Sequence, residues 1–161
     1  MTKSASACFD KVAIEEFRPK LSKYAMIHFV AMGAHEKYGW NKNSDSFTRD
    51  ELIKHHPSFV KHAHLFREHR NHDPALAIGI IKASGYNHDM DRVELLVWLD
   101  RDKAEEEYQK AASGKELSGS MACKIPWDVC NCCDKKSRTR RDYCDFMKHS
   151  ATRYIPELRK Y

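Results

Sequence analysis

The sequence predicts an α+β fold, in which a mixed or antiparallel β-sheet or barrel forms the core, helices flank it, and a zinc knuckle follows near the C-terminus. Apolar runs of strand length alternate irregularly with short helical patterns, whereas a doubly wound sheet needs regular alternation. The 161 residues are 42% hydrophobic and 32% charged, a composition typical of a globular domain. We therefore expect one domain over residues 1–161, with a cysteine-rich knuckle over residues 123–149.

Hydrophobic periodicity and chain-breaking residues set the expected elements. Thr48 with Glu51 three residues later has the spacing of a capping box and marks the start of a helix that ends before Pro57. Glycine, asparagine and serine mark turns between the apolar runs. The expected elements are, in order, a short amphipathic stretch over 12–17, a strand over 24–32, a helix over 50–56, two strands over 77–84 and 92–99 that form a hairpin around a turn at 87–91, a helix over 103–112, and a strand over 120–127 with one buried face.

Charge and hydropathy narrow the function classes. The net charge of +5 is far below the excess of a dedicated DNA-binding domain, although it favours acidic partners. The longest apolar runs fall well short of the roughly 20 residues that cross a bilayer, so no membrane partner is expected. Residues 1–10 lack the apolar core of a signal peptide, and a reducing cytoplasm is the expected compartment.

A cysteine cluster near the C-terminus predicts a metal site. Its members stand in the pattern C-x6-C-x2-C-x10-C and are Cys123, Cys130, Cys133 and Cys144. In a reducing compartment this spacing indicates zinc before it indicates disulfides, because two close thiolate pairs supply a tetrahedral set. Cys132 or His149 could replace one ligand. Four protein ligands would make the zinc structural, and its binding would supply folding free energy to a polar segment. The alternative is a set of thiols without metal.

Histidine and serine offer candidates for catalysis. His69 and His72 precede Asp73-Pro74 at the entrance of an expected strand, where side chains often project into clefts. Ser120 follows Gly119 but is not in a G-x-S-x-G nucleophile elbow. A catalytic serine requires a base within hydrogen-bonding reach and a group that orients this base, which spacing alone does not establish.

Taken together, residues 24–149 resemble the prohead (capsid maturation) proteases of tailed bacteriophages, in a subgroup with a cysteine knuckle. The family has a herpesvirus-assemblin-like fold. Four segments carry the resemblance: GWNKNSDSF at 39–47, which is similar to an N-x-N-G-D-x-F loop with Ser44 in place of glycine; FVKHAHLFREHRNHDP at 59–74, followed by AIG at 77–79; RVELLVWLD at 92–100; and SMACKIPWDVC at 120–130.

The resemblance implies a serine endopeptidase with Ser120 as nucleophile and His69 as general base. His69 keeps the H-x-N-x-D-P register, whereas His72 and His64 fit it less well. It further implies phage scaffold and major capsid proteins as substrates, a host bacterial cytoplasm and the interior of the assembling prohead as the location, and no cofactor for catalysis. Nucleic acid is not an expected partner. The formation of homo-oligomers is left open by the sequence.

The family's third catalytic residue, an acid on a later strand, has no counterpart in the sequence. Asp45, Asp100 and Asp128 are the candidates to replace it. Without such an acid, the chain would be an inactive relative or a slow enzyme, because loss of the orienting acid costs several orders of magnitude in rate.

Two interpretations from other classes compete with the protease. A non-enzymatic zinc module could bind nucleic acid or acidic protein through the basic residues 135–141. A metallohydrolase could use the histidines between residues 55 and 72, although no H-E-x-x-H helix supports it.

Overall fold

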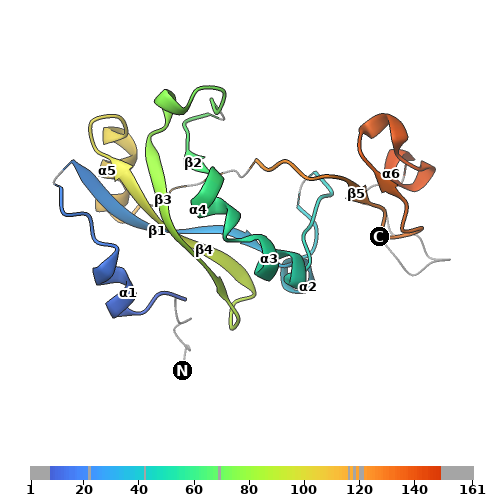
Figure 1. Ribbon diagram of the computed structural model, residues 1–161, viewed down its shortest axis with the longest axis horizontal. Coiled ribbons are helices and arrows are strands. Elements are labelled where there is room, and N and C mark those ends of the chain that lie inside the picture. Colours follow the sequence, from blue (N-terminus) through green and yellow to red (C-terminus); the bar gives the residue numbers. More distant parts are fainter. Residues whose placement is uncertain are drawn as a thin grey trace. The chain divides into compact units, whose positions relative to one another are not determined.

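The computed structural model describes residues 8–21, 23–41, 43–68, 70–115, 117, 119 and 122–149. These residues divide into two compact units (Figure 1). The first unit contains the described residues up to Gly39 and those from 47 to 119, and the second contains residues 40–46 and 122–149. The segment expected to form the knuckle therefore lies in the second unit. None of the described helices is both long enough and apolar enough to span a bilayer.

The first unit combines a sheet with short helices. Its elements are α1 (Lys11–Glu16), β1 (Tyr24–Gly33), α2 (His35–Tyr38), α3 (Arg49–His55), α4 (Ser58–His62), β2 (His64–Leu65), the 3-10 helix η1 (Pro74–Leu76), β3 (Gly79–Asn87), β4 (Arg92–Asp100) and α5 (Glu105–Ala112). The second unit contains β5 (Asp128–Val129), β6 (Lys136–Ser137), the 3-10 helix η2 (Arg140–Asp142) and α6 (Asp145–His149).

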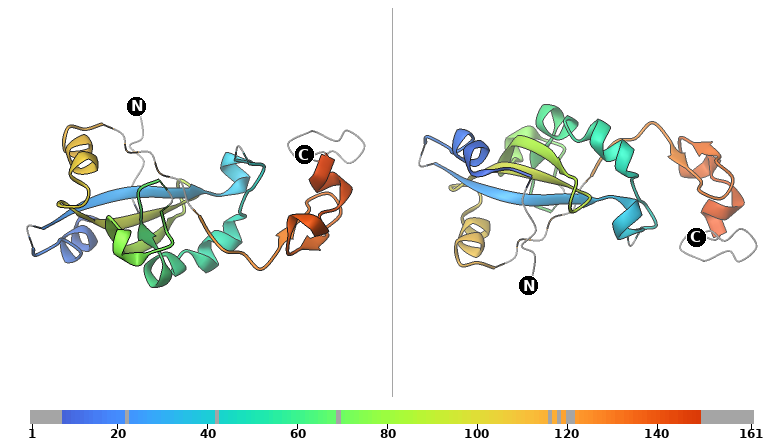
Figure 2. Two further views of the ribbon diagram at one scale, coloured as in Figure 1. Left: turned by 90° about the horizontal axis from the view of Figure 1, so that it is seen from above. Right: turned by 90° about the horizontal axis from the view of Figure 1, so that it is seen from below.

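The core of the first unit is a four-stranded antiparallel sheet in the order β1-β4-β3-β2. The two longest pairings are those of β1 with β4 and of β3 with β4, and these strands lie side by side in Figure 2. Register shifts between Val30 and Met32 in β1, and between Ile81 and Ala83 in β3, place an irregularity in each neighbour of β4. Such bulges bend and twist a sheet, which suits its half-barrel form. The predicted α+β class with an antiparallel core is confirmed.

Most predicted elements form close to their expected bounds. The hairpin of β3 and β4 closes at the pair Asn87–Arg92. At the start of α3, the Thr48 side chain accepts a hydrogen bond from the Glu51 amide, as the capping box predicts. The expected strand over 120–127 is wrong for its described part, since residues 122–127 are exposed and contain no strand. Pro126 lacks the amide that a strand interior donates, and Ile125 and Trp127, which were expected to be buried, are 45% and 42% exposed.

Alternate residues of β4 face opposite sides of the sheet. Val93, Leu95 and Val97 lie in a buried cluster that also contains Leu52 of α3. Two of the intervening positions meet the N-terminal segment: Glu94 accepts from the Cys8 amide at 2.9 Å, and the Trp98 indole nitrogen donates to the Phe17 carbonyl at 2.6 Å. Because a strand covered on both faces needs apolar side chains throughout, β4 reads as a nearly continuous apolar run.

One carboxylate, Glu94, is fully buried within this apolar strand. Its oxygens accept hydrogen bonds from the Cys8 amide at 2.9 Å, from His28 Nε2 at 2.9 Å, from Asn87 Nδ2 at 2.9 Å and from Arg92 Nε at 2.7 Å. Burial alone would raise its pKa, but these donors outweigh burial and lower the pKa from 4.5 to about 2. The buried anion therefore ties the N-terminal segment to three strands.

Replacing Glu94 with glutamine should destabilise the first unit by about 3 kcal/mol at neutral pH, the equivalent of its pKa shift. The folded-state pKa is depressed, so this contribution is present above about pH 4.5 and disappears as the pH falls toward about 2. Denaturant unfolding of both proteins across this range would measure it. Glu106→Gln, an exposed control, should stay close to wild type. A difference between wild type and Glu94→Gln that does not shrink in acid would contradict the assignment.

Cys8 should be unreactive in the folded protein. Burial, followed by the charge and the hydrogen bond of Glu94, raises the pKa of its thiol from 9.0 to about 12. Because the thiolate is the nucleophile, alkylation by iodoacetamide at about pH 8 should be slower than in the unfolded chain by a factor of at least about 100. Peptide mapping after timed alkylation measures this rate. In Glu94→Gln the protection should weaken, and equal rates in folded and unfolded protein would contradict the expectation.

Candidate metal centre and catalytic segments

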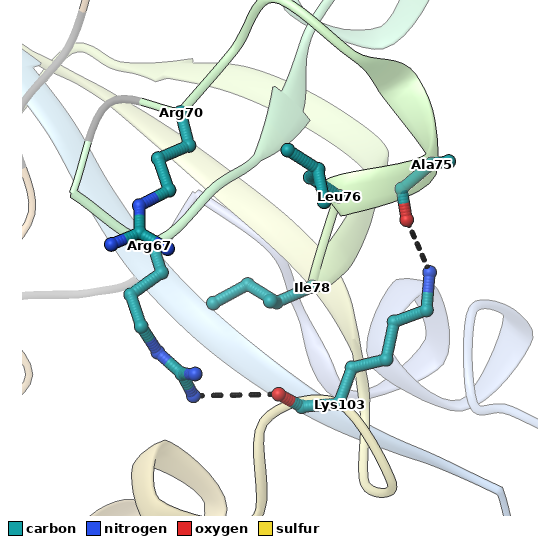
Figure 3. Close-up of a pocket in the computed structure, with 6 residues that line it drawn as sticks. All are labelled: Arg67, Arg70, Ala75, Leu76, Ile78 and Lys103. Atoms are coloured by element: carbon teal, nitrogen blue, oxygen red, sulfur yellow. Dashed lines mark hydrogen bonds between the residues drawn. The ribbon is translucent and has the colours of Figure 1, made fainter.

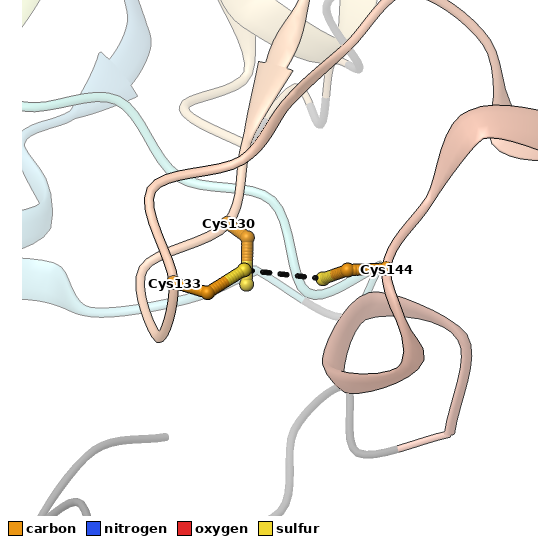
Figure 4. A group of neighbouring side chains, drawn as sticks. All are labelled: Cys130, Cys133 and Cys144. Atoms are coloured by element: carbon orange, nitrogen blue, oxygen red, sulfur yellow. Dashed lines mark hydrogen bonds between the residues drawn. The ribbon is translucent and has the colours of Figure 1, made fainter.

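Three cysteines of the second unit converge (Figure 4). The sulfur atoms of Cys130, Cys133 and Cys144 all lie within 4.8 Å of one another. Those of Cys133 and Cys144 are 3.6 Å apart, too far for a disulfide and close to the roughly 3.8 Å edge of a tetrahedral zinc site with Zn–S bonds of about 2.3 Å. The cluster could hold a metal ion such as zinc.

Short elements position the three thiols. A turn between β5 and β6 carries Cys130 and Cys133, and the Cys130 amide donates to the Lys135 carbonyl at 3.0 Å. The Asp134 amide donates a hydrogen bond to the Cys130 carbonyl at 2.8 Å, and Asp134 has the left-handed conformation with a φ of 56°. Cys144 directly precedes α6, and its carbonyl accepts from the Lys148 amide at 3.0 Å. Local backbone hydrogen bonds therefore shape each of the two segments that carry the thiols, and Cys133 and Cys144 lie 11 residues apart in sequence.

The surroundings favour a thiolate at Cys144. Burial would raise its pKa, but the Met147 amide and the thiols of Cys130 and Cys133 donate toward its sulfur and lower the pKa. At Cys133 the Lys135 amide lowers the pKa, yet burial and the neighbouring Cys144 and Cys130 thiols outweigh it and raise the pKa. The Cys133 thiol accordingly donates to the Cys144 sulfur. A soft divalent ion would replace the shared proton, since metal ligands are thiolates.

The remaining predicted ligands lie outside this cluster. Among the described residues, neither Cys123, Cys132 nor His149 brings a ligand atom within 4.8 Å of all three sulfurs. Cys123 is an exposed residue on the irregular stretch 122–127. Partial burial of its sulfur, and then the charges of Asp45 and Asp128, raise the pKa of this thiol.

The loop over residues 40–46 belongs to the same unit as the cysteines. The Asn41 side-chain oxygen accepts from the amides of Asn43 and Asp45 at 2.8 and 3.0 Å. The Ser44 amide donates to the Asn41 carbonyl at 3.0 Å, and Ser44 has a φ of 67°. This left-handed conformation is the one that glycine adopts freely. The position at which the resembled loop has glycine is thus one where the backbone favours it.

Replacing Ser44 with glycine should stabilise this loop by about 0.5–1 kcal/mol, because serine bears the cost of a left-handed backbone. Amide exchange at Asn43 and Asp45 would show the change as added protection. Ser44→Ala is the matched control: it also removes the hydroxyl but keeps a Cβ, and should bring no gain. Equal effects of the two substitutions would contradict the backbone explanation.

Both residues expected to carry catalysis, Ser120 and His69, lie outside the described residues. The chain next to Ser120 is closely packed, because a Cβ at Gly119 would overlap the Phe29 ring of β1. Upstream of His69, Arg67 binds Glu107 of α5 with two hydrogen bonds of 2.8 and 2.7 Å. The other histidines considered as base, His64 and His72, are exposed.

Two of the three candidates for the third catalytic residue have structural partners. Asp100 pairs with Lys23 at 3.2 Å and accepts from the Asp102 amide. Asp128 accepts from the Tyr143 hydroxyl at 2.6 Å, and this bond raises the tyrosine pKa to about 12. Within the described part of the chain, the Asp45 carboxylate makes neither a hydrogen bond nor an ion pair.

Two histidine pairs emerge that sequence reasoning missed. His28 meets Glu94 across strands β1 and β4. His56 Nδ1 lies 3.0 Å from Ser84 Oγ, and burial lowers the histidine pKa. The Ser84 hydroxyl donates to the His56 carbonyl at 3.0 Å, so its proton is already used and the pair fastens the end of α3 to β3. No sequence spacing signals either pair, because pairing across elements depends on register.

Comparisons of the chain with protein-family models, with curated proteins and with solved structures return no significant match.

Proposed function

We propose that this protein is a serine endopeptidase of phage capsid assembly, which cleaves scaffold and major capsid proteins inside the prohead of a host bacterium, with its own chain as a further candidate substrate. The observation that carries the proposal is the conformation of Ser44. A motif that resembles the protease loop N-x-N-G-D-x-F adopts a left-handed backbone at the position of its glycine. The antiparallel half-barrel sheet and the cysteine cluster after the expected nucleophile add support.

In this proposal Ser120 attacks the peptide carbonyl while His69 accepts its proton and later donates it to the leaving amine. The contact of Gly119 with Phe29 and the ion pair of Arg67 with Glu107 support it, because they anchor chain next to both residues on the first unit. The third member in this proposal is one of Asp45, Asp100 and Asp128, of which Asp100 and Asp128 have other partners.

The metal proposed for the cluster is one structural zinc ion held by Cys130, Cys133 and Cys144, with Cys123 as the fourth ligand. Three thiols at near-tetrahedral spacing support it. Cys123 lies on the irregular, exposed stretch 122–127, where none of the described strands fixes its position. When bound, zinc supplies folding free energy to the second unit and takes no part in the cleavage step.

The test is incubation of the purified chain, and of its Ser120→Ala variant, with the cognate scaffold protein, followed by intact mass measurement. Fragments produced by wild type and absent with the variant are the expected result. Absence of fragments from both proteins would remove the protease proposal in favour of an inactive relative or a binding module.

One observation favours a second candidate, a zinc-stabilised module that binds nucleic acid or acidic protein. Trp127 is 42% exposed, and Lys136 Nζ lies 4.9 Å from its ring centroid. An exposed aromatic ring beside the basic residues 135–141 resembles a stacking platform for single strands. This candidate predicts affinity that falls with added salt and does not change in Ser120→Ala.

A further inference from the structure

A cavity of about 320 Å3 lies in the first unit (Figure 3). It is lined by Arg67, Arg70, Ala75, Leu76, Ile78 and Lys103. The two arginines come from the turn after β2, and Lys103 comes from the turn before α5. The volume falls at the lower end of the range of small-ligand sites.

The polar side of this cavity carries more positive than negative charge. Arg67 pairs with Glu107 at 2.7 Å, and Arg70 pairs with Glu68 at 3.1 Å. Among the described residues, Lys103 Nζ donates only to the carbonyls of Ala75 and Ala77, at 2.7 and 3.3 Å, and no carboxylate lies within 4.0 Å of it. Three cations thus face two carboxylates.

Donor groups remain after these bonds are counted. Among the described residues, Arg67 finds acceptors for Nε and Nη2, which leaves the Nη1 group. Within the same part of the chain, Arg70 donates a side-chain hydrogen bond only through Nη2. The Lys103 ammonium has three N–H bonds and two carbonyl acceptors. Unused donors on three cations around one cavity match the acceptor oxygens of a carboxylate.

Backbone geometry holds the two arginines on the same cavity. The Arg70 amide donates to the Arg67 carbonyl at 3.1 Å and closes the turn. Glu68 within this turn has a φ of 51°, a left-handed conformation that is strained for a residue with a Cβ. Strain of this kind persists where the surrounding structure fixes it, and it often accompanies a binding site.

The floor of the cavity is apolar. Ile78 is 7% exposed and Leu76 is 44% exposed. Figure 3 shows both side chains between the arginines and Lys103. A ligand that carries a carboxylate on a short aliphatic stem would therefore place its charge among the cations and its methylene groups on the leucine and isoleucine. A bare inorganic anion would leave this floor exposed.

We propose that this cavity is a binding site for a carboxylate on a short aliphatic stem. Two sources share this chemistry: a free dicarboxylate, and an acidic side chain of an extended peptide. The peptide source rests on the proposed protease function, whereas the free dicarboxylate does not.

The proposal is tested by titrating the full chain with glutarate, and separately with a capped tripeptide whose central residue is glutamate, while amide chemical shifts are recorded. Glutaramide and the same peptide with glutamine are the matched controls. We expect at least one of the acids to bind with a Kd below about 10 mM, at least about tenfold tighter than its amide. Tighter binding of the peptide would assign a substrate side chain, and tighter binding of glutarate a free ligand.

Variants locate the site. Arg70→Gln and Lys103→Gln should each weaken binding by about tenfold, whereas Lys110→Gln, which removes an exposed lysine paired with Glu106, should not. Arg70 is exposed, and in the described part of the chain its side chain bonds only to Glu68, so its loss should leave the fold intact even if Lys103→Gln loosens η1. Absence of binding by both acids, equal binding of acid and amide, or unchanged affinity in Arg70→Gln would overturn the proposal. Binding is measured without any cleavage step, so a negative protease test would not change the outcome of this binding experiment.

Discussion

Under the proposed protease function, replacing Ser120 with alanine is expected to abolish cleavage of the scaffold protein, with a fall in kcat of about 10^4- to 10^6-fold. The reason is that the hydroxyl supplies the bond to the peptide carbonyl, and no neighbouring group in a serine protease replaces it. His69→Ala should cost a similar factor, and the double variant little more, because nucleophile and base act as one unit. Time courses read by intact mass would measure each rate.

The other two histidines provide the matched controls. His64→Ala and His72→Ala should retain cleavage within about threefold, since both are exposed residues and neither keeps the family register as His69 does. A variant of His72 or His64 that loses activity while His69→Ala keeps it would move the base to that position. Cleavage that persists in Ser120→Ala would exclude the serine mechanism altogether.

The loss of one zinc ligand is the second large effect that we expect. Cys133→Ser should remove the single zinc ion that native mass spectrometry is expected to detect, and should unfold the second unit. Zinc binding in small cysteine sites is worth of order 10 kcal/mol or more, and the second unit has only short strands and helices to replace it. Fluorescence of Trp127 and amide spectra would report the unfolding, while the four-stranded sheet of the first unit should persist.

Neighbouring side chains serve as controls for the metal site. Cys132→Ser should keep the zinc, because its sulfur lies outside the three-cysteine cluster. Cys123→Ser should weaken zinc binding if Cys123 is the fourth ligand. If His149 is the fourth ligand instead, His149→Ala should weaken zinc binding and Cys123→Ser should not. Full zinc occupancy in Cys133→Ser, or a chelator-treated protein with an unchanged second unit, would contradict a structural metal.

Loss of the metal also tests its proposed link to catalysis. If zinc acts only through folding, Cys132→Ser should cleave at the wild-type rate, and Cys133→Ser should lose activity in step with its unfolded fraction. The two large effects can therefore be separated, since Ser120→Ala should retain zinc and both folded units.

Much of the fold follows from local sequence signals. The apolar runs predicted strands that form as β1, β3 and β4 within a few residues of their expected bounds. The capping box at Thr48 predicted the start of α3, because a side chain three residues from its amide partner needs no tertiary contact to bond. The cysteine spacing likewise predicted a cluster, and three of its four expected members converge.

The exposed stretch 122–127 shows where local signals fail. Alternation of apolar and polar residues predicts a strand only if another strand lies beside it, and none of the described strands pairs with this stretch. Two further short elements, α2 and α4, carry no periodic signal because each is five residues or shorter.

The sequence by itself determined the α+β class, the hairpin, the capped helix and the cysteine turn, because each depends on residues close together in the chain. Only the tertiary structure decided the buried Glu94 with its partners on three other segments, and the convergence of Arg67, Arg70 and Lys103 on one cavity. These features depend on strand register and on turns that bring distant residues into contact, and neither is encoded in any single stretch of sequence.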